Sequence, residues 1–183
     1  MQKTIEIVTR LARDRVIGNY AIAGAVAALN YIQPTLTEDL DILISVDSFE
    51  KTGSSLLLLG PIEKALAEMG YTQRMAVGYM IEGWPVQFLP VSSPLDEEAL
   101  AEAIEVDISG SAEHPVYARC LSAEHVVATA TKVGRINDLA RIQAFLDQGA
   151  VDLNRLKAIL EKHNLMDAWR LNCFKIGIKN PLN

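Results

Sequence analysis

The sequence lacks the many cysteines and the excess of basic residues that are typical of disulfide-rich proteins, zinc-binding proteins and proteins that bind nucleic acid non-specifically. Only two cysteines occur among its 183 residues, Cys120 and Cys173, and they lie far apart and in no motif. They predict neither a disulfide framework nor a zinc-site spacing, so we expect two reduced, buried thiols. Basic residues number 17 against 23 acidic ones, which gives a net charge of −6. This balance argues against a broad basic surface that binds nucleic acid, and we expect no DNA partner.

Long apolar segments are also missing. The longest apolar stretch lies near 56–62 and is too short to span a bilayer. Residues 1–19 carry charged side chains throughout and lack the apolar core of a signal peptide, so we expect no membrane partner and a cytoplasmic location. The three histidines follow no metal-ligand spacing and are expected to be surface or structural residues: His114, His125 and His163.

Half of the residues are hydrophobic, which lets one domain, with or without a small appendage, bury a sizeable core. Apolar spacing and turn residues divide the first 121 residues into helices and strands in alternation. Helices are expected over 2–16, 25–31, 56–69 and 94–105. Extended segments are expected over 20–23 and 39–44, in two strands within 71–91 that meet near 82–83, and over 106–121.

From residue 122 onward the pattern is helical throughout. Gly134, Gly149 and Asn164 separate the helical stretches, which are expected over 122–133, 136–148, 152–163 and 165–176. We therefore expect an α+β fold, with an α/β core over 1–121 and a C-terminal helical region over 122–183 that packs on this core.

The strongest chemical signal is a pair of carboxylates on one predicted strand. Asp39 and Asp41 are separated by one residue, so they leave the same face with Cα atoms about 6.6 Å apart. Like charges this close repel, and a divalent cation is a natural companion; Mg²⁺ in particular keeps positions open for phosphate oxygens. Gly24, between a strand and a helix, would let the backbone approach a phosphate near the helix N-terminus. In the alternative interpretation, 37–39 is only an acidic loop that leads into a core strand.

The segment Ile22-Ala23-Gly24-Ala25-Val26-Ala27, followed by Thr37-Glu38-Asp39-Leu40-Asp41-Ile42, resembles the nucleotidyltransferase superfamily. The pattern of that superfamily is a hydrophobic residue, Gly, then Gly or Ser, a gap of about nine to thirteen residues, and two Asp separated by one hydrophobic residue. The Thr-x-Asp-h-Asp strand is also similar to that of AbiEii-type nucleotidyltransferase-like proteins, which include toxins of toxin–antitoxin systems.

A second match lies downstream, in the same order as in that family. The helix Leu121–Lys132 with its lysine, followed by Gly134–Leu139 with a Gly-Arg-x-x-Asp-h pattern, resembles the corresponding family segment. By this resemblance Lys132 would act catalytically by contacting a phosphate, and Arg135 and Asp138 would shape the same cleft. Other interpretations remain open, because a helical lysine commonly belongs to a solvated face and Asp138 could equally cap a helix or form a salt bridge.

The resemblance implies a polymerase-beta-like nucleotidyltransferase fold: a mixed-sheet core followed by a helical region. Asp39 and Asp41 would be catalytic residues that hold Mg²⁺ as the cofactor. The Gly24-Ala25 turn and Thr37 would bind the nucleotide. Transfer of this kind depends on charge neutralisation and in-line positioning more than on covalent chemistry.

Two residues depart from the family pattern. Ala25 stands where the family has Gly or Ser, and it offers no hydroxyl to a phosphate. The third carboxylate of the family comes from a neighbouring strand, for which Val86-Gln87-Phe88-Leu89 is the candidate, and Gln87 fills that position. Glutamine is a neutral ligand and a poor general base, although its amide could still contact the nucleotide.

Two functions are therefore weighed. In the first, the protein is a Mg²⁺-dependent enzyme that transfers NMP from an NTP to an RNA such as tRNA, to a protein or to a small molecule, and it has an antitoxin partner. In the second, Ala25 and Gln87 mark a catalytically degenerate member that binds a nucleotide or a partner protein.

Overall fold

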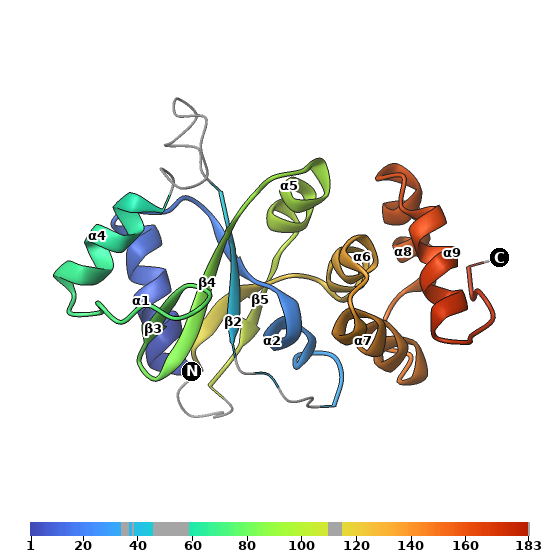
Figure 1. The fold of residues 1–183 in the computed structure, drawn as a ribbon, viewed down its shortest axis with the longest axis horizontal. Coiled ribbons are helices and arrows are strands. Elements are labelled where there is room, and N and C mark those ends of the chain that lie inside the picture. The colour runs from blue at the N-terminus through green and yellow to red at the C-terminus, as the bar shows by residue number, and fades with distance from the viewer. Residues whose placement is uncertain (34–36, 38, 46–58, 110–114, 183) are drawn as a thin grey trace.

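Helices cover both faces of a mixed β-sheet (Figure 1). The computed structural model describes residues 1–33, 37, 39–45, 59–109 and 115–182, and within these residues the sheet has six strands. The strands are β1 (Tyr20–Ile22), β2 (Leu40–Ile44), β3 (Tyr79–Ile81), β4 (Trp84–Pro90), β5 (Ile104–Asp107) and β6 (Tyr117–Cys120). The helices are α1 (Gln2–Arg13), α2 (Gly24–Ala28), α4 (Gly60–Glu68), α5 (Pro94–Ala101), α6 (Ala123–Val133), α7 (Ile136–Asp147), α8 (Leu153–Lys162) and α9 (Met166–Lys175).

The strand order along the sheet is β3-β4-β2-β1-β6-β5. The interior strand β2 is parallel to β4 and antiparallel to β1, and β1 is in turn parallel to β6. β3 and β4 form a hairpin whose two turn residues, Glu82 and Gly83, both have positive φ, as a type I′ turn requires. The predicted turn near 82–83 and the α+β class, with a mixed sheet before a C-terminal helical region, are confirmed.

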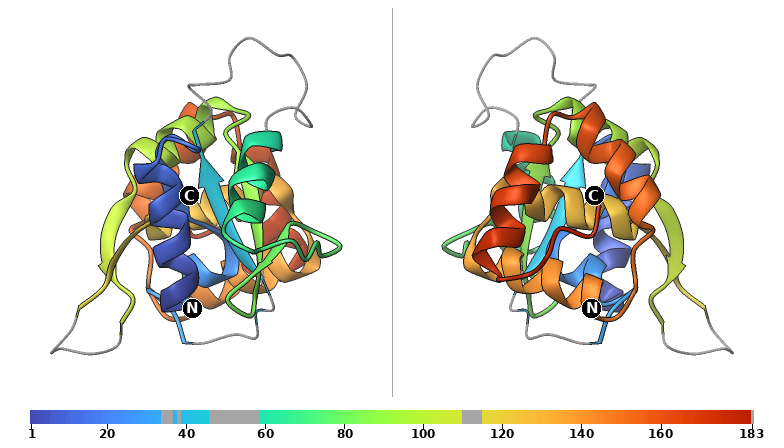
Figure 2. Two further views of the ribbon diagram at one scale, coloured as in Figure 1. Left: turned by 90° about the vertical axis from the view of Figure 1, so that its left-hand side faces the viewer. Right: turned by 90° about the vertical axis from the view of Figure 1, so that its right-hand side faces the viewer.

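The sheet separates two groups of helices. α1 and α4 lie on one face, and α2, α5 and the C-terminal helices lie on the other (Figure 1). Figure 2 shows the two ends of this arrangement, with α1 and α4 toward the viewer in one view and α8 and α9 in the other. α1 turns one stripe of residues at helical spacing inward: Thr4, Ile5, Val8 and Leu11.

α6 is the central helix of the C-terminal part, in contact with α2, α5, α7, α8 and α9. It begins where the Ser122 hydroxyl accepts the backbone N–H of His125, and it ends at Gly134, which has φ +66°. The left-handed glycine lets the chain turn at once into α7. Cys120 and Cys173 are free and buried, as predicted.

Several predicted boundaries need correction. The helix expected over 94–105 ends at Ala101, and Ile104–Asp107 is instead a strand, because these residues pair in register with β6. The helix expected over 25–31 is shorter and begins one residue earlier, at Gly24–Ala28. The helix expected over 56–69 is Gly60–Glu68 with Pro61 in its first turn, and 56–58 lie outside the described residues, as do 110–114 of the predicted extended segment.

None of the helices in the described part of the chain combines the length and the apolar character that a membrane span needs.

Candidate functional site

The two strands that were expected to carry the acidic residues and Gln87 are neighbours in the sheet. β2 and β4 are parallel, and their register pairs Asp41 directly with Gln87. Burial alternates along β4, where Val86 and Phe88 are buried while Gln87 is half-buried. Asp39 lies just before β2, at the same end of the strand. The parallel register therefore places the Gln87 side chain beside Asp41, at the position where the resemblance predicts a third carboxylate.

These residues open into one cavity of about 740 Å³. Its walls come from the β1–α2 turn, the start of β2, the middle of β4, and helices α6 and α7. The charged lining residues are Asp39, Asp41, Asp138, Arg135 and Arg141, a formal charge of −1. The uncharged lining residues are Ala23, Gly24, Ala25, Gln87, Leu89, Val126, Thr129, Ala130, Val133, Ile136 and Asn137. A cavity of this size matches those that hold small ligands and cofactors.

Gly24 is held against Asp41. It has φ +59°, a conformation that side chains disfavour, and a Cβ built on it would collide with the Asp41 carboxylate. The adjacent Ala23 N–H donates to the Asp41 carbonyl oxygen at 2.9 Å, which fixes the turn to the strand. The position needs glycine because the backbone passes so close to a carboxylate.

Burial, followed by the negative charge of Asp39, raises the pKa of Asp41 above its ordinary value of 3.8. Arg141 and Arg135 oppose this effect with their positive charges, and Asp138 adds to it. Ionised Asp41 is thus under electrostatic stress that a bound cation would relieve. The carboxylates of Asp39 and Asp41 and the side-chain amide oxygen of Gln87 form a set of hard oxygen donors, which fits Mg²⁺.

Asp138 organises the α6–α7 junction as well as lining the cavity. Its carboxylate accepts the backbone N–H of Arg135 at 3.1 Å and pairs with the Arg141 guanidinium at 3.0 Å. Both roles weighed from the sequence, a helix cap and a salt bridge, are therefore present in addition to its place in the cavity wall. The pair also holds Arg141, on the next turn of α7, toward the cavity.

Lys132 is not among the described residues that line the cavity. Its ammonium donates to the Ser93 hydroxyl at 2.7 Å and lies 3.5 Å from the Asp96 carboxylate, so it joins α6 to the start of α5. Burial alone would raise the pKa of Asp96, but hydrogen bonds from Ser93 and Ser92, together with the Lys132 charge, bring it below its ordinary value. In this structure, Lys132 connects two helices.

Thr37 also lies outside the described lining of the cavity. Its hydroxyl donates to the backbone carbonyl of Asp39 at 3.1 Å, so its contact with the acidic pair is through the main chain. Of the residues predicted to form the site, the structure thus brings together Gly24, Ala25, Asp39, Asp41, Gln87, Arg135 and Asp138. Glu38 of the same motif is outside the described residues.

The sequence analysis did not identify Arg141. It follows Asp138 by three residues on α7, and this spacing, which predicts contact on one helix face, is the signal that could have identified it. The sequence did not show that this face turns toward β2, because that depends on how α7 packs.

Comparison with known proteins gives limited information. No protein-family model matches the sequence, and no curated protein matches it. Among solved structures, a crystal structure of ANT(2″)-Ia in complex with adenylyl-2″-tobramycin has TM-score 0.49 at 14% identity, covering 89% of this chain and 96% of that one. The solution structure of the antibiotic-resistance factor ANT(2″)-Ia has TM-score 0.49 at 15% identity, covering 91% and 92%. Likeness at this level establishes neither a family nor a function.

Proposed function

We propose that the protein is a Mg²⁺-dependent nucleotidyltransferase, which binds an NTP in the cavity and transfers its NMP to an acceptor. The observation that carries this proposal is the close approach of the Gly24 turn to Asp41, beside Asp39 and Gln87 and facing two arginines across one cavity. Carboxylates for a metal, a glycine turn and cations facing them are the parts that nucleotidyl transfer needs.

Asp39, Asp41 and the Gln87 amide oxygen would hold the metal, which when bound neutralises phosphate charge and aligns the attacking and leaving oxygens. Arg141 and Arg135 would bind the phosphates, since guanidinium groups match phosphate oxygens bidentately. The Ala23–Ala25 backbone would follow the phosphate chain closely. Thr37 would support the loop that presents Asp39, through its bond to the Asp39 carbonyl.

Lys132 takes a positioning role in this proposal. Its bonds to Ser93 and Asp96 hold α5 against α6, and α6 contributes Val126, Thr129 and Ala130 to the cavity wall. Lys132 would then affect activity through the placement of α6.

Binding of a nucleotide without transfer is the alternative, and two features of the site favour it. Gln87 stands directly beside Asp41, where a third carboxylate would complete the metal site, and Ala25 has no hydroxyl. A site with two carboxylates holds a cation less tightly and lacks a base to take the proton of the acceptor.

The proposal also concerns the acceptor, the molecule that receives the NMP. An RNA such as tRNA, a protein or a small molecule would each fit an open cavity, and the AbiEii-like sequence pattern adds a toxin–antitoxin role with an antitoxin partner. The net charge of −6 gives the RNA acceptor no general electrostatic support.

The test is a transfer assay with each of the four α-labelled NTPs, Mg²⁺, and three acceptor pools: total tRNA, the protein itself with other proteins, and small polyols and amino sugars. The proposal predicts that label enters one pool, and that Asp41→Asn abolishes transfer while circular dichroism shows an intact fold. Nucleotide binding that depends on Asp41 without transfer to any pool would support the alternative. Transfer at the wild-type rate by Asp41→Asn would mean that the site is wrongly assigned.

A further inference from the structure

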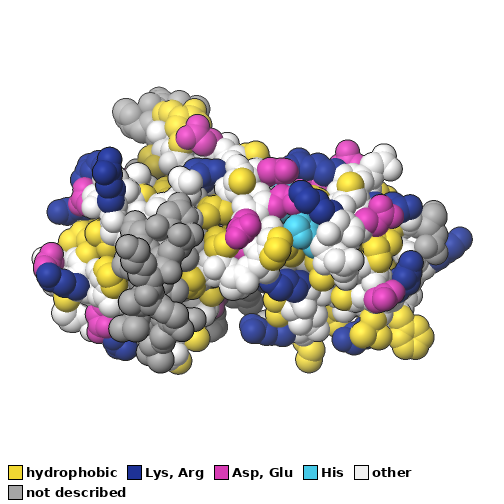
Figure 3. Space-filling view, turned by 90° about the horizontal axis from the view of Figure 1, so that it is seen from above, with side chains coloured by type: hydrophobic (Ala, Val, Ile, Leu, Met, Phe, Trp, Pro, Cys, Tyr) yellow, Lys and Arg dark blue, Asp and Glu magenta, His cyan; other side chains and the backbone are white. Residues whose placement is uncertain are grey.

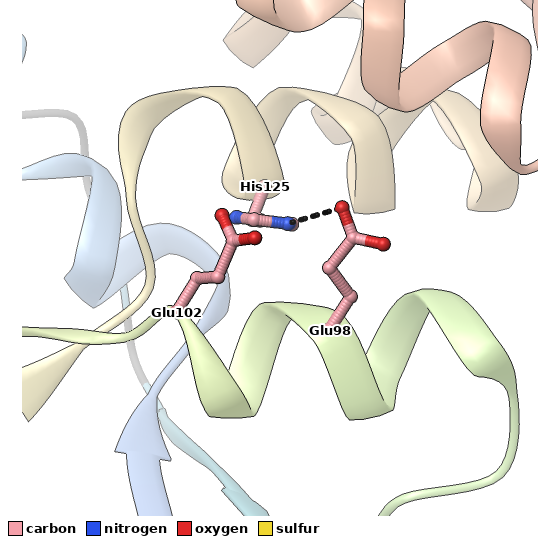
Figure 4. A group of neighbouring side chains, drawn as sticks. All are labelled: Glu98, Glu102 and His125. Carbon is pink, nitrogen blue, oxygen red and sulfur yellow. Dashed lines mark ion pairs between the residues drawn. The ribbon is translucent and has the colours of Figure 1, made fainter.

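A second polar cluster lies between α5 and the start of α6, and none of its residues lines the cavity. Glu98 lies on α5, Glu102 follows it by four residues and caps the C-terminal end of α5, and His125 belongs to the first turn of α6. One potential ligand atom from each residue lies within 4.8 Å of the others. Figure 4 shows the imidazole between the two carboxylates, with its ring edge toward Glu98.

The imidazole of His125 is fully buried and only half satisfied. Its Nδ1 lies 3.0 Å from the Ser122 hydroxyl, which fixes the ring. Its Nε2 has no hydrogen-bond partner within the described part of the chain, and the nearest Glu98 oxygen is 3.8 Å away, too far for a hydrogen bond. Buried polar atoms are almost always satisfied, so an open Nε2 that faces two carboxylates points to a missing ligand.

Glu98 is oriented by its other oxygen. Its Oε2 is 2.8 Å from His163 Nε2 and 2.5 Å from the Lys162 ammonium, while Oε1 is the atom that faces His125. A carboxylate whose second oxygen is held by a histidine is a common arrangement around metal ligands, because the outer hydrogen bond fixes the ligand's direction.

The cations near the cluster do not block it. Lys162 and Arg155 come from α8, and their side chains are 64% and 46% exposed. Lys162 pairs with Glu98, and Arg155 pairs with Glu102 and Glu124. Because both basic side chains reach the solvent, they can turn away from these carboxylates when another cation binds. Figure 3 shows acidic and basic side chains around a histidine on the side of the molecule where α5 lies. The Glu102 side chain is 48% exposed, so an ion in solution can reach the cluster through this residue.

We propose that His125 Nε2, Glu98 and Glu102 form a binding site for a divalent transition-metal ion of the zinc class, which joins α5 to α6. One imidazole nitrogen with two carboxylates suits zinc better than magnesium, and three protein ligands leave a fourth position for water. Tetrahedral zinc places its ligand atoms roughly 3.4 Å apart, so the flexible glutamates need to close only slightly. The site is independent of the nucleotide function, and its expected effect is structural.

The three histidines were expected from their spacing to be surface or structural residues. The proposed ligands come from two helices, and spacing along the chain did not reveal them because Glu98 and His125 are brought together only by the packing of α5 on α6. His163 joins from α8 through its bond to Glu98.

Calorimetric titration with Zn²⁺ tests this proposal, on untagged full-length protein that carries Asp39→Asn and Asp41→Asn to remove the other candidate metal site. We expect one equivalent to bind, with affinity reduced at least about 100-fold by Glu98→Gln and roughly 10- to 100-fold by His163→Ala, which removes only an outer contact. Glu97→Gln is the matched control, since Glu97 is an exposed neighbour on the same helix and should bind Zn²⁺ as the parent does.

Co²⁺ gives a second readout on the same proteins. Absorption bands of four-coordinate Co²⁺ should appear in the parent and in Glu97→Gln, and disappear in Glu98→Gln. Because His125 is fully buried, His125→Ala also tests folding, and Glu98→Gln is therefore the decisive variant. No Zn²⁺ binding by the parent, or equal binding by Glu98→Gln and Glu97→Gln, would overturn the proposal.

Discussion

Gly24 and Asp41 are the two residues on which the site depends most closely. The glycine has a left-handed conformation and lies where any Cβ would meet the Asp41 carboxylate. The acid is half-buried beside a second acid, and its pKa is raised. Gly24 adopts a backbone conformation that other residues disfavour, and Asp41 keeps a partly buried charge beside another acid, which is a feature typical of functional sites.

Gly24→Ala should destabilise the fold by roughly 1–2 kcal/mol from the left-handed conformation alone, with a further loss from the collision with Asp41. Urea unfolding measures the change. Gly60→Ala is the control, because Gly60 begins α4 with no neighbour near its Cβ, and it should be neutral or stabilising by about 0.4–1 kcal/mol. Equal effects of the two variants would contradict the close approach.

Asp41→Asn should stabilise the protein at pH 7 when EDTA removes cations. A carboxyl group with a raised pKa in the folded state favours folding while protonated, and this contribution is lost as the pH rises through that pKa. The advantage of the asparagine should therefore vanish below the ordinary pKa of 3.8. Unfolding curves of both proteins at pH 7 and at a pH below 3.8, with and without Mg²⁺, check this prediction. A variant that is less stable than wild type at pH 7 in EDTA would contradict it.

Gln87→Glu should place a third carboxylate beside Asp41. We expect affinity for Mg²⁺ to rise roughly tenfold, which corresponds to about 1.4 kcal/mol. Calorimetry of Mg²⁺ binding measures the change, and Gln73→Glu, on an exposed loop residue, controls for added charge. Unchanged affinity would show that the residue at position 87 does not reach the metal.

At the scale of elements, the junctions of α6 connect the site to the rest of the fold. Glu124 in its first turn pairs with Arg155 of α8, and Lys132 near its end pairs with Asp96 of α5. Four of its residues line the cavity: Val126, Thr129, Ala130 and Val133. The C-terminal helices were predicted well because glycines and capping residues mark their ends. The end of α5 was not, because Ile104–Asp107 becomes a strand only through pairing with β6, which no local signal shows.

Lys132→Met should lower the free energy of unfolding by about 0.5–1 kcal/mol at pH 7, since a partly exposed ion pair and a hydrogen bond to α5 are lost. The lowered pKa of Asp96 means that its stabilising effect is present above the ordinary pKa of 3.8 and is lost as the pH falls through its folded value. The difference between variant and wild type should therefore shrink in acid. Loss of transfer without any loss of stability would instead support a direct catalytic role for Lys132.

At the scale of the molecule, the site is assembled from segments that lie far apart in the sequence. The β1–α2 turn and β2 supply the glycine and the acids, and the α6–α7 pair supplies the arginines and Asp138. The motif residues could be predicted because their spacing along a strand fixes the face on which they lie. The positions of Arg141 and Lys132 could not be predicted, because they depend on how the helices pack. The packing of α7 turns Arg141 toward the cavity, and the packing of α5 on α6 brings Lys132 to Asp96.

The central claim is that Asp39 and Asp41 form a Mg²⁺-dependent nucleotide site, and thermal unfolding with each NTP tests it most directly. At about 100 times Kd a ligand adds about 2.7 kcal/mol, which raises Tm by roughly 5–10 °C in a protein of this size. We predict such a rise for at least one NTP with Mg²⁺, none with EDTA, and none in the Asp39→Asn/Asp41→Asn variant. An equal rise in that variant, or no rise with any of the four nucleotides, would contradict the claim.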